Sequence, residues 1–255
     1  MLTAPLDGRV TLIAGAGNGM GRATALLFAQ AGAEVAVVAR SAARLEATAT
    51  EIADTTGRAP LVLAADLVAP EAATGVTEAV LARWGRLDAV LVNAGTSGYF
   101  DLDLPATPRE VEDEMIDLNL RTALNTARAT LPALSERSGS LILVAAAPKT
   151  LLWPNTMYAA TKSAVLGLTT GLAREWWPRV RVNSISPGSI RRVRVSGVIA
   201  PIEGPLDRGG RPDDVMHFGG EPADIAHAAL FLAGPTSSWI TGVDLPVDGG
   251  AHLRW

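Results

Sequence analysis

Short apolar runs alternate with longer segments of helical periodicity along most of the chain. The runs are rich in β-branched residues and are bounded by glycine, proline or polar residues, which is typical of buried strands. They lie at 9–14, 34–39, 60–65, 87–92, 139–144, 180–186 and 242–247. The intervening segments repeat apolar residues with the period of a helix. They lie at about 22–30, 41–56, 71–84, 108–135, 158–177 and 222–233.

This alternation predicts a fold class. Strands that alternate with helices at this spacing are joined by right-handed crossovers, and they form a parallel sheet with helices on both faces. We find no linker, repeat or low-complexity tract, so we expect one domain over residues 1–255. Segment 189–221 departs from the pattern, because it has little apolar periodicity and many Gly, Pro and Arg residues. A segment of this length and composition is typical of a functional lid or of a disordered stretch.

A glycine-rich turn joins the first predicted strand to the first predicted helix. It reads Gly15-Ala16-Gly17-Asn18-Gly19-Met20-Gly21. Small residues let the backbone approach a pyrophosphate, and the helix N-terminus presents N–H groups and the positive end of its dipole. Because the motif lies between a strand and a helix, it predicts a dinucleotide site, with a tight turn that binds no ligand as the alternative.

The end of the second strand bears on the choice of dinucleotide. Sites without a 2′-phosphate commonly place Asp or Glu there to hold the ribose hydroxyls. This chain instead has Ala39 followed by Arg40 and Ser41. A cation beside a hydroxyl suits a phosphate, so we expect NADP(H) to be preferred over NAD(H). The alternative is that Arg40 is a solvated residue at the start of a helix.

Polar and small residues also follow the third and fourth predicted strands. Asp66 and Leu67 follow the third, and Asn93, Ala94 and Gly95 follow the fourth. Ligands of parallel sheets bind beyond the carboxyl ends of the strands. We therefore expect these residues to gather at one edge, beside the glycine turn.

Tyr158 and Lys162 stand four residues apart in a predicted helix, so both side chains can face one site. A phenol titrates near ~10, and a nearby ammonium favours the phenolate and lowers that pKa. The pair is a candidate proton donor and acceptor near neutral pH. The chain has only one other lysine, Lys149, which favours a specific role for Lys162 over a packed Tyr beside a solvated Lys.

Asn119 stands among apolar residues in the predicted helix 108–135. It is either a buried group that ties two backbone segments together or part of a proton relay, and the two roles are compatible.

Composition and charge exclude several classes of function. The net charge of −4 gives no nucleic-acid footprint and no surface for an anionic membrane. The absence of cysteine excludes disulfides and thiol catalysis, and it fits a cytoplasmic location. The N-terminus lacks the features of a signal peptide, and no apolar stretch approaches the ~18 residues of a membrane span. His217, His227 and His252 lack ligand spacing, so we expect no metal site.

Taken in order, these motifs resemble the short-chain dehydrogenase/reductase family over essentially the full length of the chain. The resemblance rests on the glycine turn, Asp66, Asn93-Ala94-Gly95, Asn119, Tyr158 with Lys162, Pro187-Gly188, and the closing Thr241-Gly242 and Val247-Asp248-Gly249-Gly250. It implies a seven-stranded, doubly wound Rossmann fold, a homotetramer or homodimer, and hydride transfer between NAD(P) and a carbonyl or alcohol.

The resemblance also implies roles for single residues. Asp66 would hold the adenine amino group, and Tyr158 would donate the proton to the substrate oxygen. Lys162 would bind the nicotinamide ribose and lower the pKa of Tyr158, and Asn119 would anchor a water that leads protons to Lys162. The remaining cofactor contacts would come from Asn93, Ala94, Gly95, Pro187, Gly188 and Ile190. Segment 189–221 would be the substrate lid.

Apolar and aromatic residues near the expected pocket indicate the size of the substrate. Tyr99, Phe100, Trp153 and Met157 would make its walls, which fits a medium-sized or larger organic molecule. The alternative is that Trp153 and Met157 pack against a neighbouring subunit.

One family feature is missing from this chain. The family uses a Ser about thirteen residues before the Tyr, whereas this chain has Ala145-Ala146-Ala147 in that region and no Ser between Ser140 and Ser163. Losing one donor to a developing oxyanion typically costs about 10²–10³ in rate. Three hypotheses follow. In the first, redox chemistry persists and the missing donor comes from the substrate or from Lys149, Thr150, Asn155 or Thr156. In the second, the site reduces or oxidises a group that needs no Ser, such as an imine or an enone. In the third, the fold serves as a non-redox enzyme or as a cofactor-binding subunit.

Overall fold

Seven parallel strands form one sheet in the computed structural model, which describes residues 5–96, 103–147, 156–190 and 219–253. The strand order is β3-β2-β1-β4-β5-β6-β7, and all six pairings are parallel. The predicted doubly wound, seven-stranded sheet is therefore confirmed. The strands are β1 (Val10–Ala14), β2 (Glu34–Ala39), β3 (Leu61–Ala64), β4 (Ala89–Val92), β5 (Ser140–Val144), β6 (Arg181–Pro187) and β7 (Asp244–Val247).

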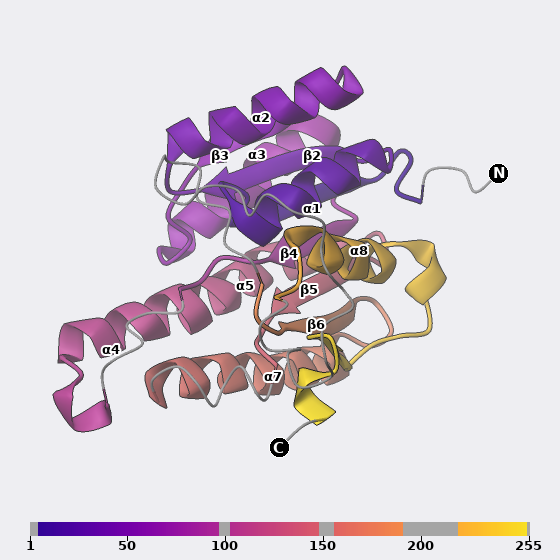
Figure 1. The fold of residues 1–255 in the computed structure, drawn as a ribbon. Coiled ribbons are helices and arrows are strands. Elements are labelled where there is room, and N and C mark those ends of the chain that lie inside the picture. Colours follow the sequence, from indigo (N-terminus) through magenta and orange to yellow (C-terminus); the bar gives the residue numbers. More distant parts are fainter. Residues whose placement is uncertain (1–4, 97–102, 148–155, 191–218, 254–255) are drawn as a thin grey trace, which may run out of the picture.

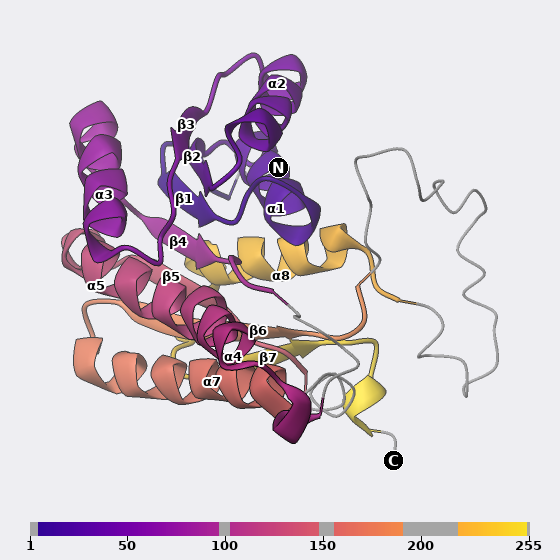
Figure 2. The same cartoon turned by 90° about the vertical axis from the view of Figure 1, so that its left-hand side faces the viewer.

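Helices cover both faces of this sheet (Figures 1 and 2). One face carries α1 (Gly19–Gln30), α2 (Ala42–Thr56) and α8 (Pro222–Ala233), and the other carries α3 (Pro70–Trp84), α5 (Thr122–Ser135) and α7 (Thr156–Trp176). Each face buries its own apolar cluster against the strands. The chain order reverses between β1 and β4, and ligands of open α/β sheets bind beyond the strand ends at such a point.

The predicted helix 108–135 is not one regular α-helix. It consists of α4 (Arg109–Ile116), a π-helical segment (Asp117–Arg121) and α5. In a π-helical segment the hydrogen bonds join residues five apart instead of four, so the helix is wider there, and such segments are frequent at functional sites. This one contains Asn119, which is buried.

Several predicted strand bounds were too wide. The last strand was expected from Gly242, but Gly242 has a φ of +76°, which lies outside the β region, and β7 begins at Asp244. Leu87 and Asp88 also precede β4, although both are buried. Burial therefore indicates where a strand lies, but it does not show which of its residues pair with the neighbouring strand.

Asp88 fixes the amino edge of the sheet, opposite the expected site. Its carboxylate accepts hydrogen bonds from the backbone N–H of Val10 at 2.9 Å and from the Arg86 guanidinium at 2.6 and 2.8 Å. Its backbone carbonyl accepts from the N–H of Ser140. The side chain and the backbone of Asp88 together thus tie the starts of β1 and β5 to the residue before β4.

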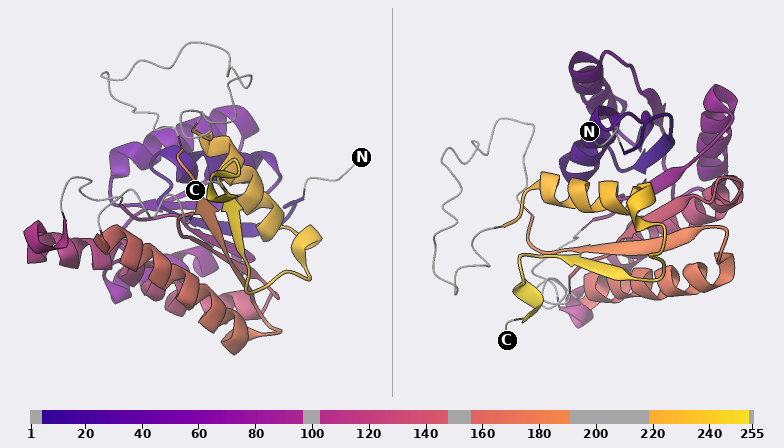
Figure 3. Two further views of the ribbon diagram at one scale, coloured as in Figure 1. Left: turned by 60° about the horizontal axis from the view of Figure 1, so that its bottom comes forward. Right: turned by 90° about the vertical axis from the view of Figure 1, so that its right-hand side faces the viewer.

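The short elements are η1 (Leu104–Ala106), η4 (Pro235–Ser237) and η5 (Ala251–Leu253). Figure 3 shows η5 beyond the end of β7, at the same edge as the carboxyl ends of the other strands. Within the described ranges, none of the helices is long and apolar enough to cross a membrane. Most of the predicted lid at 189–221 lies outside the described residues.

Candidate cofactor and active site

The glycine turn has the close backbone packing that a dinucleotide site requires. Gly15 has a φ of +86°, and a Cβ atom there would lie 2.7 Å from the backbone nitrogen of Ala94. A Cβ atom at Gly21 would collide with the carbonyl of Gly15. Asn18 precedes α1 without capping it through its side chain, and the first turn of α1 has no acidic residue. The N–H groups at this helix end therefore suit an anion.

Two side chains hold the carbonyls of the glycine turn. Thr48 of α2 is fully buried, and its hydroxyl donates to the carbonyl of Ala16 at 3.0 Å. The amide of Asn93 donates to the carbonyl of Gly15 at 3.4 Å, while its buried Oδ1 atom has no partner in the described part of the chain. A buried acceptor without a donor beside a dinucleotide turn fits a site that a ligand completes.

Two arginines flank the end of β2. Arg40 is exposed, and Ser41 caps α2 by accepting from the N–H of Arg44 at 3.4 Å. A Cβ atom at Gly17 would lie 3.3 Å from the Cβ of Arg44, so the stem of Arg44 lies against the glycine turn. Neither Arg40 nor Arg44 forms an ion pair with another described residue. Arg44 was not among the residues predicted from the sequence to bind the cofactor.

Asp66 lies in a tight turn after β3. Its Oδ1 accepts from the N–H of Val68 at 3.1 Å, and its carbonyl accepts from the N–H of Ala69 at 3.2 Å. The Asp66 side chain is exposed, whereas Leu67 is buried in the core. Leu67 can therefore offer a cofactor only its backbone, and Asp66 can offer its second carboxylate oxygen.

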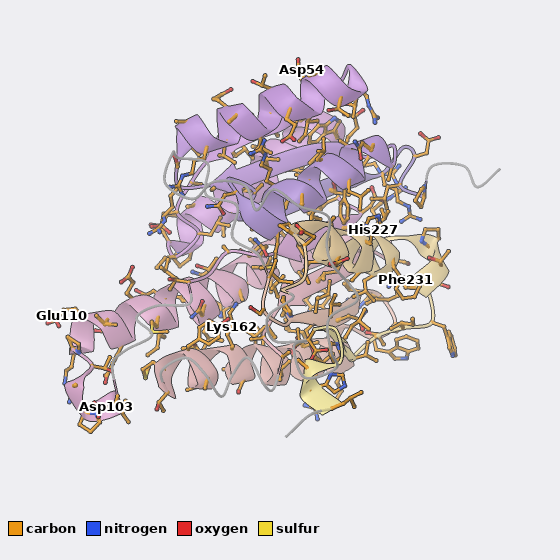
Figure 4. The ribbon with its side chains drawn as sticks, viewed as in Figure 1. Asp54, Asp103, Glu110, Lys162, His227 and Phe231 are labelled. Atoms are coloured by element: carbon orange, nitrogen blue, oxygen red, sulfur yellow. The ribbon has the colours of Figure 1, made fainter. Side chains whose placement is uncertain are left out.

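Lys162 is the most unusual titratable group among the described residues. It is 5% exposed, and its Nζ donates to the carbonyl of Val144 at 2.8 Å. Burial lowers the pKa of Lys162 from 10.5 to about 8, because the charged form is poorly solvated there. Figure 4 shows Lys162 between the ribbons of α5 and α7, whereas the labelled carboxylates Asp103 and Glu110 lie far out, near the start of α4.

Asn119 connects α7, at the residue before Lys162, to the loop after β4. Its Oδ1 accepts from the N–H of Thr96 at 2.8 Å, and its amide donates to the hydroxyl of Thr161 at 3.2 Å. A Cβ atom at Gly95 would lie 2.7 Å from Asn119 Oδ1 and 3.2 Å from Lys162 Nζ. Asn119 therefore holds one backbone segment, the loop after β4, and its second partner is a side chain. The proton relay stays a prediction.

Tyr158 lies in the first turn of α7, one turn before Lys162, and is partly buried. Its carbonyl accepts from the hydroxyl of Thr161 at 3.2 Å. Residues four apart lie on the same side of a helix, so the phenol and the ammonium belong to one face. This face is turned toward the ends of β4 and β5, because Lys162 contacts Val144.

The ends of β5, β6 and β7 complete the expected nicotinamide side. Ala145, Ala146 and Ala147 are buried, and the N–H of Ala147 donates to the carbonyl of Pro187 at 3.0 Å. The N–H of Gly188 donates to the carbonyl of Val247, and a Cβ atom at Gly188 would lie 2.7 Å from the Cβ of Asp248. Ile190 forms a bridge with Gly220. These contacts bring the three strand ends side by side.

Some predicted site residues lie outside the described residues: Lys149, Thr150, Asn155, Tyr99, Phe100 and Trp153. Thr156 begins α7 and is exposed, and Met157 is partly buried. In the described ranges, no group of three or more Asp, Glu and His side chains could hold a metal ion.

Comparison with known proteins gives a consistent assignment. The family model described as enoyl-(acyl carrier protein) reductase matches residues 15–252. An uncharacterized oxidoreductase of Mycobacterium tuberculosis is 35% identical over 250 residues, covering 96% of this chain and 92% of that protein. The 3-oxoacyl-(acyl-carrier-protein) reductase of Thermotoga maritima is 33% identical over 253 residues, covering 96% and 98%.

Solved structures agree with these relatives. A short-chain type dehydrogenase/reductase from Mycobacterium marinum superposes with a TM-score of 0.85 at 30% identity, over 99% of this chain and 98% of that chain. A short chain dehydrogenase of Shigella flexneri was solved with NADP (TM-score 0.81, 28% identity, 96% and 98% covered). Carveol dehydrogenase of Mycobacterium avium was solved with NAD (TM-score 0.82, 27% identity, 98% and 99% covered). The chain therefore belongs to the short-chain dehydrogenase/reductase family and is an oxidoreductase of that type.

Proposed function

We propose that this protein is an NADP(H)-dependent oxidoreductase that transfers hydride to or from a carbonyl, enone, imine or alcohol of a medium-sized organic substrate. The observation that carries the proposal is the buried ammonium of Lys162, held between Val144 and Gly95 one helical turn after Tyr158. A buried cation without a carboxylate is costly, so it is an expected feature of a functional site rather than of a packed core.

The two side chains have distinct roles in this proposal. When bound, the nicotinamide supplies or accepts the hydride. Tyr158 gives the proton to the substrate oxygen or nitrogen, or takes it in the reverse direction. Lys162 favours the phenolate form of Tyr158 by its charge and donates to the nicotinamide ribose. Asn119 holds the loop at Gly95 and Thr96 and anchors a water that leads protons to Lys162.

Cofactor binding in this proposal follows the edge of the sheet. The N–H groups at Asn18, Gly19 and Met20 face the pyrophosphate, and Asp66 accepts from the adenine amino group. The backbone of Leu67, Asn93, Ala94 and Gly95 lines the trough, and Pro187, Gly188 and Ile190 flank the nicotinamide. Two observations support this assignment: the Oδ1 of Asn93 has no hydrogen-bond partner among the described residues, and the glycine turn tolerates no Cβ at Gly15 or Gly21.

The preference for NADP(H) rests on the end of β2. Arg40 and Ser41 supply a cation and a hydroxyl where NAD-dependent sites commonly have an acid. Arg44 adds a second cation beside Gly17. Solved relatives are described with NADP and with NAD, so the preference depends on these residues. We expect Arg40→Ala to weaken NADPH binding about tenfold or more and to leave NADH binding nearly unchanged, as measured by titration of cofactor fluorescence.

The missing Ser restricts the chemistry that we propose. Ala145 stands thirteen residues before Tyr158, is 2% exposed and offers only a methyl group. Either Lys149, Thr150, Asn155 or Thr156 supplies a donor, or the substrate needs none. An imine or an activated enone meets the second condition, because its reacting atom depends less on an oxyanion donor.

The three apolar residues Ala145, Ala146 and Ala147 also favour a second candidate function. A site without the Ser would suit a non-redox enzyme of the isomerase or lyase type, or a cofactor-binding subunit without catalysis. We would titrate the protein with NADPH and NADH, then supply ketones, enones and imines and follow cofactor oxidation. Tight NADPH binding with turnover on one class supports the oxidoreductase. Binding without turnover on every class supports the second candidate. If neither nucleotide binds, the oxidoreductase is contradicted and only the fold remains.

The proposal extends to the assembly and to the lid. We infer a homotetramer or homodimer, because the family pairs subunits through the helices that correspond to α4, α5 and α7. Leu124 on α5 is 37% exposed, and Trp177 just after α7 is 49% exposed, so apolar surface is available on that side. We also infer that segment 189–221 closes over the medium-sized organic substrate and that residues 1–255 form a single domain.

A further inference from the structure

Asn125 of α5 reaches across to the turn after β3. It is buried, and its amide group donates to the carbonyl of Leu67 at 3.3 Å and to the carbonyl of Val68 at 2.8 Å. An amide has two N–H donors, so both are used on two consecutive carbonyls of one turn. The donor lies on a helix more than fifty positions along the chain from the two carbonyls that it holds.

The bonds from Asn125 add to hydrogen bonds within the turn. Asp66 accepts from the N–H of Val68 through its Oδ1 and from the N–H of Ala69 through its carbonyl. Leu67 packs into the core next to α3, which begins directly after the turn and lies beside α5 in Figure 2. The backbone from Asp66 to Ala69 is therefore held from two sides, and the direction of the Asp66 carboxylate depends on both.

The same helical stretch holds a second loop of the site. Asn119, six residues before Asn125 and within the π-helical segment, accepts from the N–H of Thr96 after β4. One asparagine thus fixes the loop at the expected nicotinamide end, and the other fixes the turn at the expected adenine end. Both are buried polar groups, which are retained in cores when they specify a particular arrangement of backbone.

We propose that Asn125 is a positioning residue for the adenine end of the cofactor site, which acts through the Leu67 and Val68 carbonyls on Asp66. This inference rests on the proposed function, because it needs a bound adenine nucleotide. Asn125 does not touch the cofactor. It sets the orientation of the carboxylate that does, so its loss reduces the affinity for adenine nucleotides and leaves the chemical step unchanged.

The test compares Asn125→Leu, which keeps the size of the side chain and removes both donors, with the wild type. We expect the Kd of NADPH and the Kd of adenosine 2′,5′-bisphosphate, measured by displacement of NADPH fluorescence, to rise about five- to tenfold. The kcat at saturating NADPH should stay within about twofold. Thr130→Val is the matched control, because Thr130 is also buried on α5 but donates within its own helix to Thr126. It should leave both Kd values unchanged.

A double-mutant cycle separates positioning from a general loss of stability. If Asn125 acts through Asp66, adding Asn125→Leu to Asp66→Ala should change the Kd of NADPH by less than about twofold. Full additivity would overturn the proposal, as would wild-type Kd values in Asn125→Leu. Asn125→Ser, which fits the same space with less apolar bulk, repeats the cycle should Asn125→Leu fail to fold. If the wild type binds no nucleotide, the proposed function fails. If the wild type binds NADPH and Asn125→Leu binds it with the same Kd, this inference alone fails.

Discussion

At the scale of single residues, the buried ammonium of Lys162 links stability to function. Its pKa is lowered to about 8 by burial, whereas in the unfolded chain it titrates near its ordinary 10.5. Below about pH 8 the lysine is charged in both states, and the folded protein carries the full cost of burying the charge. Between these two values the folded protein has lost the proton and the unfolded chain still holds it, so stability rises with pH in that window.

Lys162→Met should therefore stabilise the protein without cofactor at pH 7. Removal of the buried charge, less the lost bond to Val144, is worth about 2 kcal/mol. This gain should fall as the pH rises from about 8 toward 10.5, and it should become a small loss there, because the neutral lysine costs little to bury and still donates to Val144. Urea unfolding at pH 7 and pH 10 measures both values. A variant that is less stable than the wild type at pH 7 would show that the charge is compensated.

A second residue-scale prediction concerns the missing hydroxyl. Ala145→Ser or Ala146→Ser should raise kcat on a simple ketone about tenfold or more, because a hydroxyl donor would then meet the developing oxyanion. Ala147→Ser in the same buried run is the control, and it should have no such effect. Steady-state kinetics at saturating cofactor give the comparison. Unchanged or lower kcat in both test variants would mean that the site does not use an oxyanion donor at this position.

Site residues that belong to short local motifs could be predicted from the sequence. Contacts between side chains and distant segments of the chain could not. Tyr158, Lys162 and the glycines stand in local patterns that depend on the geometry of one helix or one turn. Thr48 and Asn125 act on Ala16 and on the turn after β3, and nothing near either residue in the sequence indicates these contacts. Asn119 was noticed only because a polar residue stood among apolar ones.

At the scale of elements, the two edges of the sheet have separate tasks. The carboxyl edge carries the candidate site, and the amino edge carries Asp88 with Val10 and Arg86. Substitutions at the amino edge should therefore change the stability of the fold without changing cofactor binding.

Asp88→Asn tests this separation. It should lower the free energy of unfolding by about 2 kcal/mol, because the buried bonds to Val10 and Arg86 lose a charged acceptor. The Kd of NADPH should stay unchanged. Asp117→Asn is the control, since its pair with Arg121 is exposed and worth less than about 0.5 kcal/mol. Urea unfolding and fluorescence titration provide the two readings, and a large loss of NADPH affinity in Asp88→Asn would contradict the separation.

Element bounds illustrate what periodicity can and cannot determine. The helix at 222–233 was predicted with its observed bounds, because Pro222 begins it and Gly234 ends it. The strand bounds were less accurate, since burial extends beyond the ladder at Leu87 and backbone conformation ends it at Gly242. The π-helical segment had no sequence signal, because its widening depends on contacts with α7 and the loop after β4.

At the scale of the whole molecule, the fold and family followed from the order of the motifs, whereas the assembly depends on surface that the single chain leaves exposed. We expect light scattering to give two or four times the mass of one chain. Leu124→Glu should lower that mass, because it places a charge on exposed apolar surface of α5. Thr50→Glu adds the same charge to an exposed position on α2 and should leave the mass unchanged. A monomeric wild type would contradict the inferred assembly.

The central claim is that Tyr158, assisted by Lys162, transfers the proton to or from the substrate in a reaction that uses NADP(H). The most direct measurement is the oxidation of NADPH by the wild type and by Tyr158→Phe on the substrate class to which the wild type responds. We predict that Tyr158→Phe binds NADPH within about twofold of the wild type and loses at least about 10²-fold in kcat. Turnover that persists in Tyr158→Phe would contradict the account, because the proton would then come from another group.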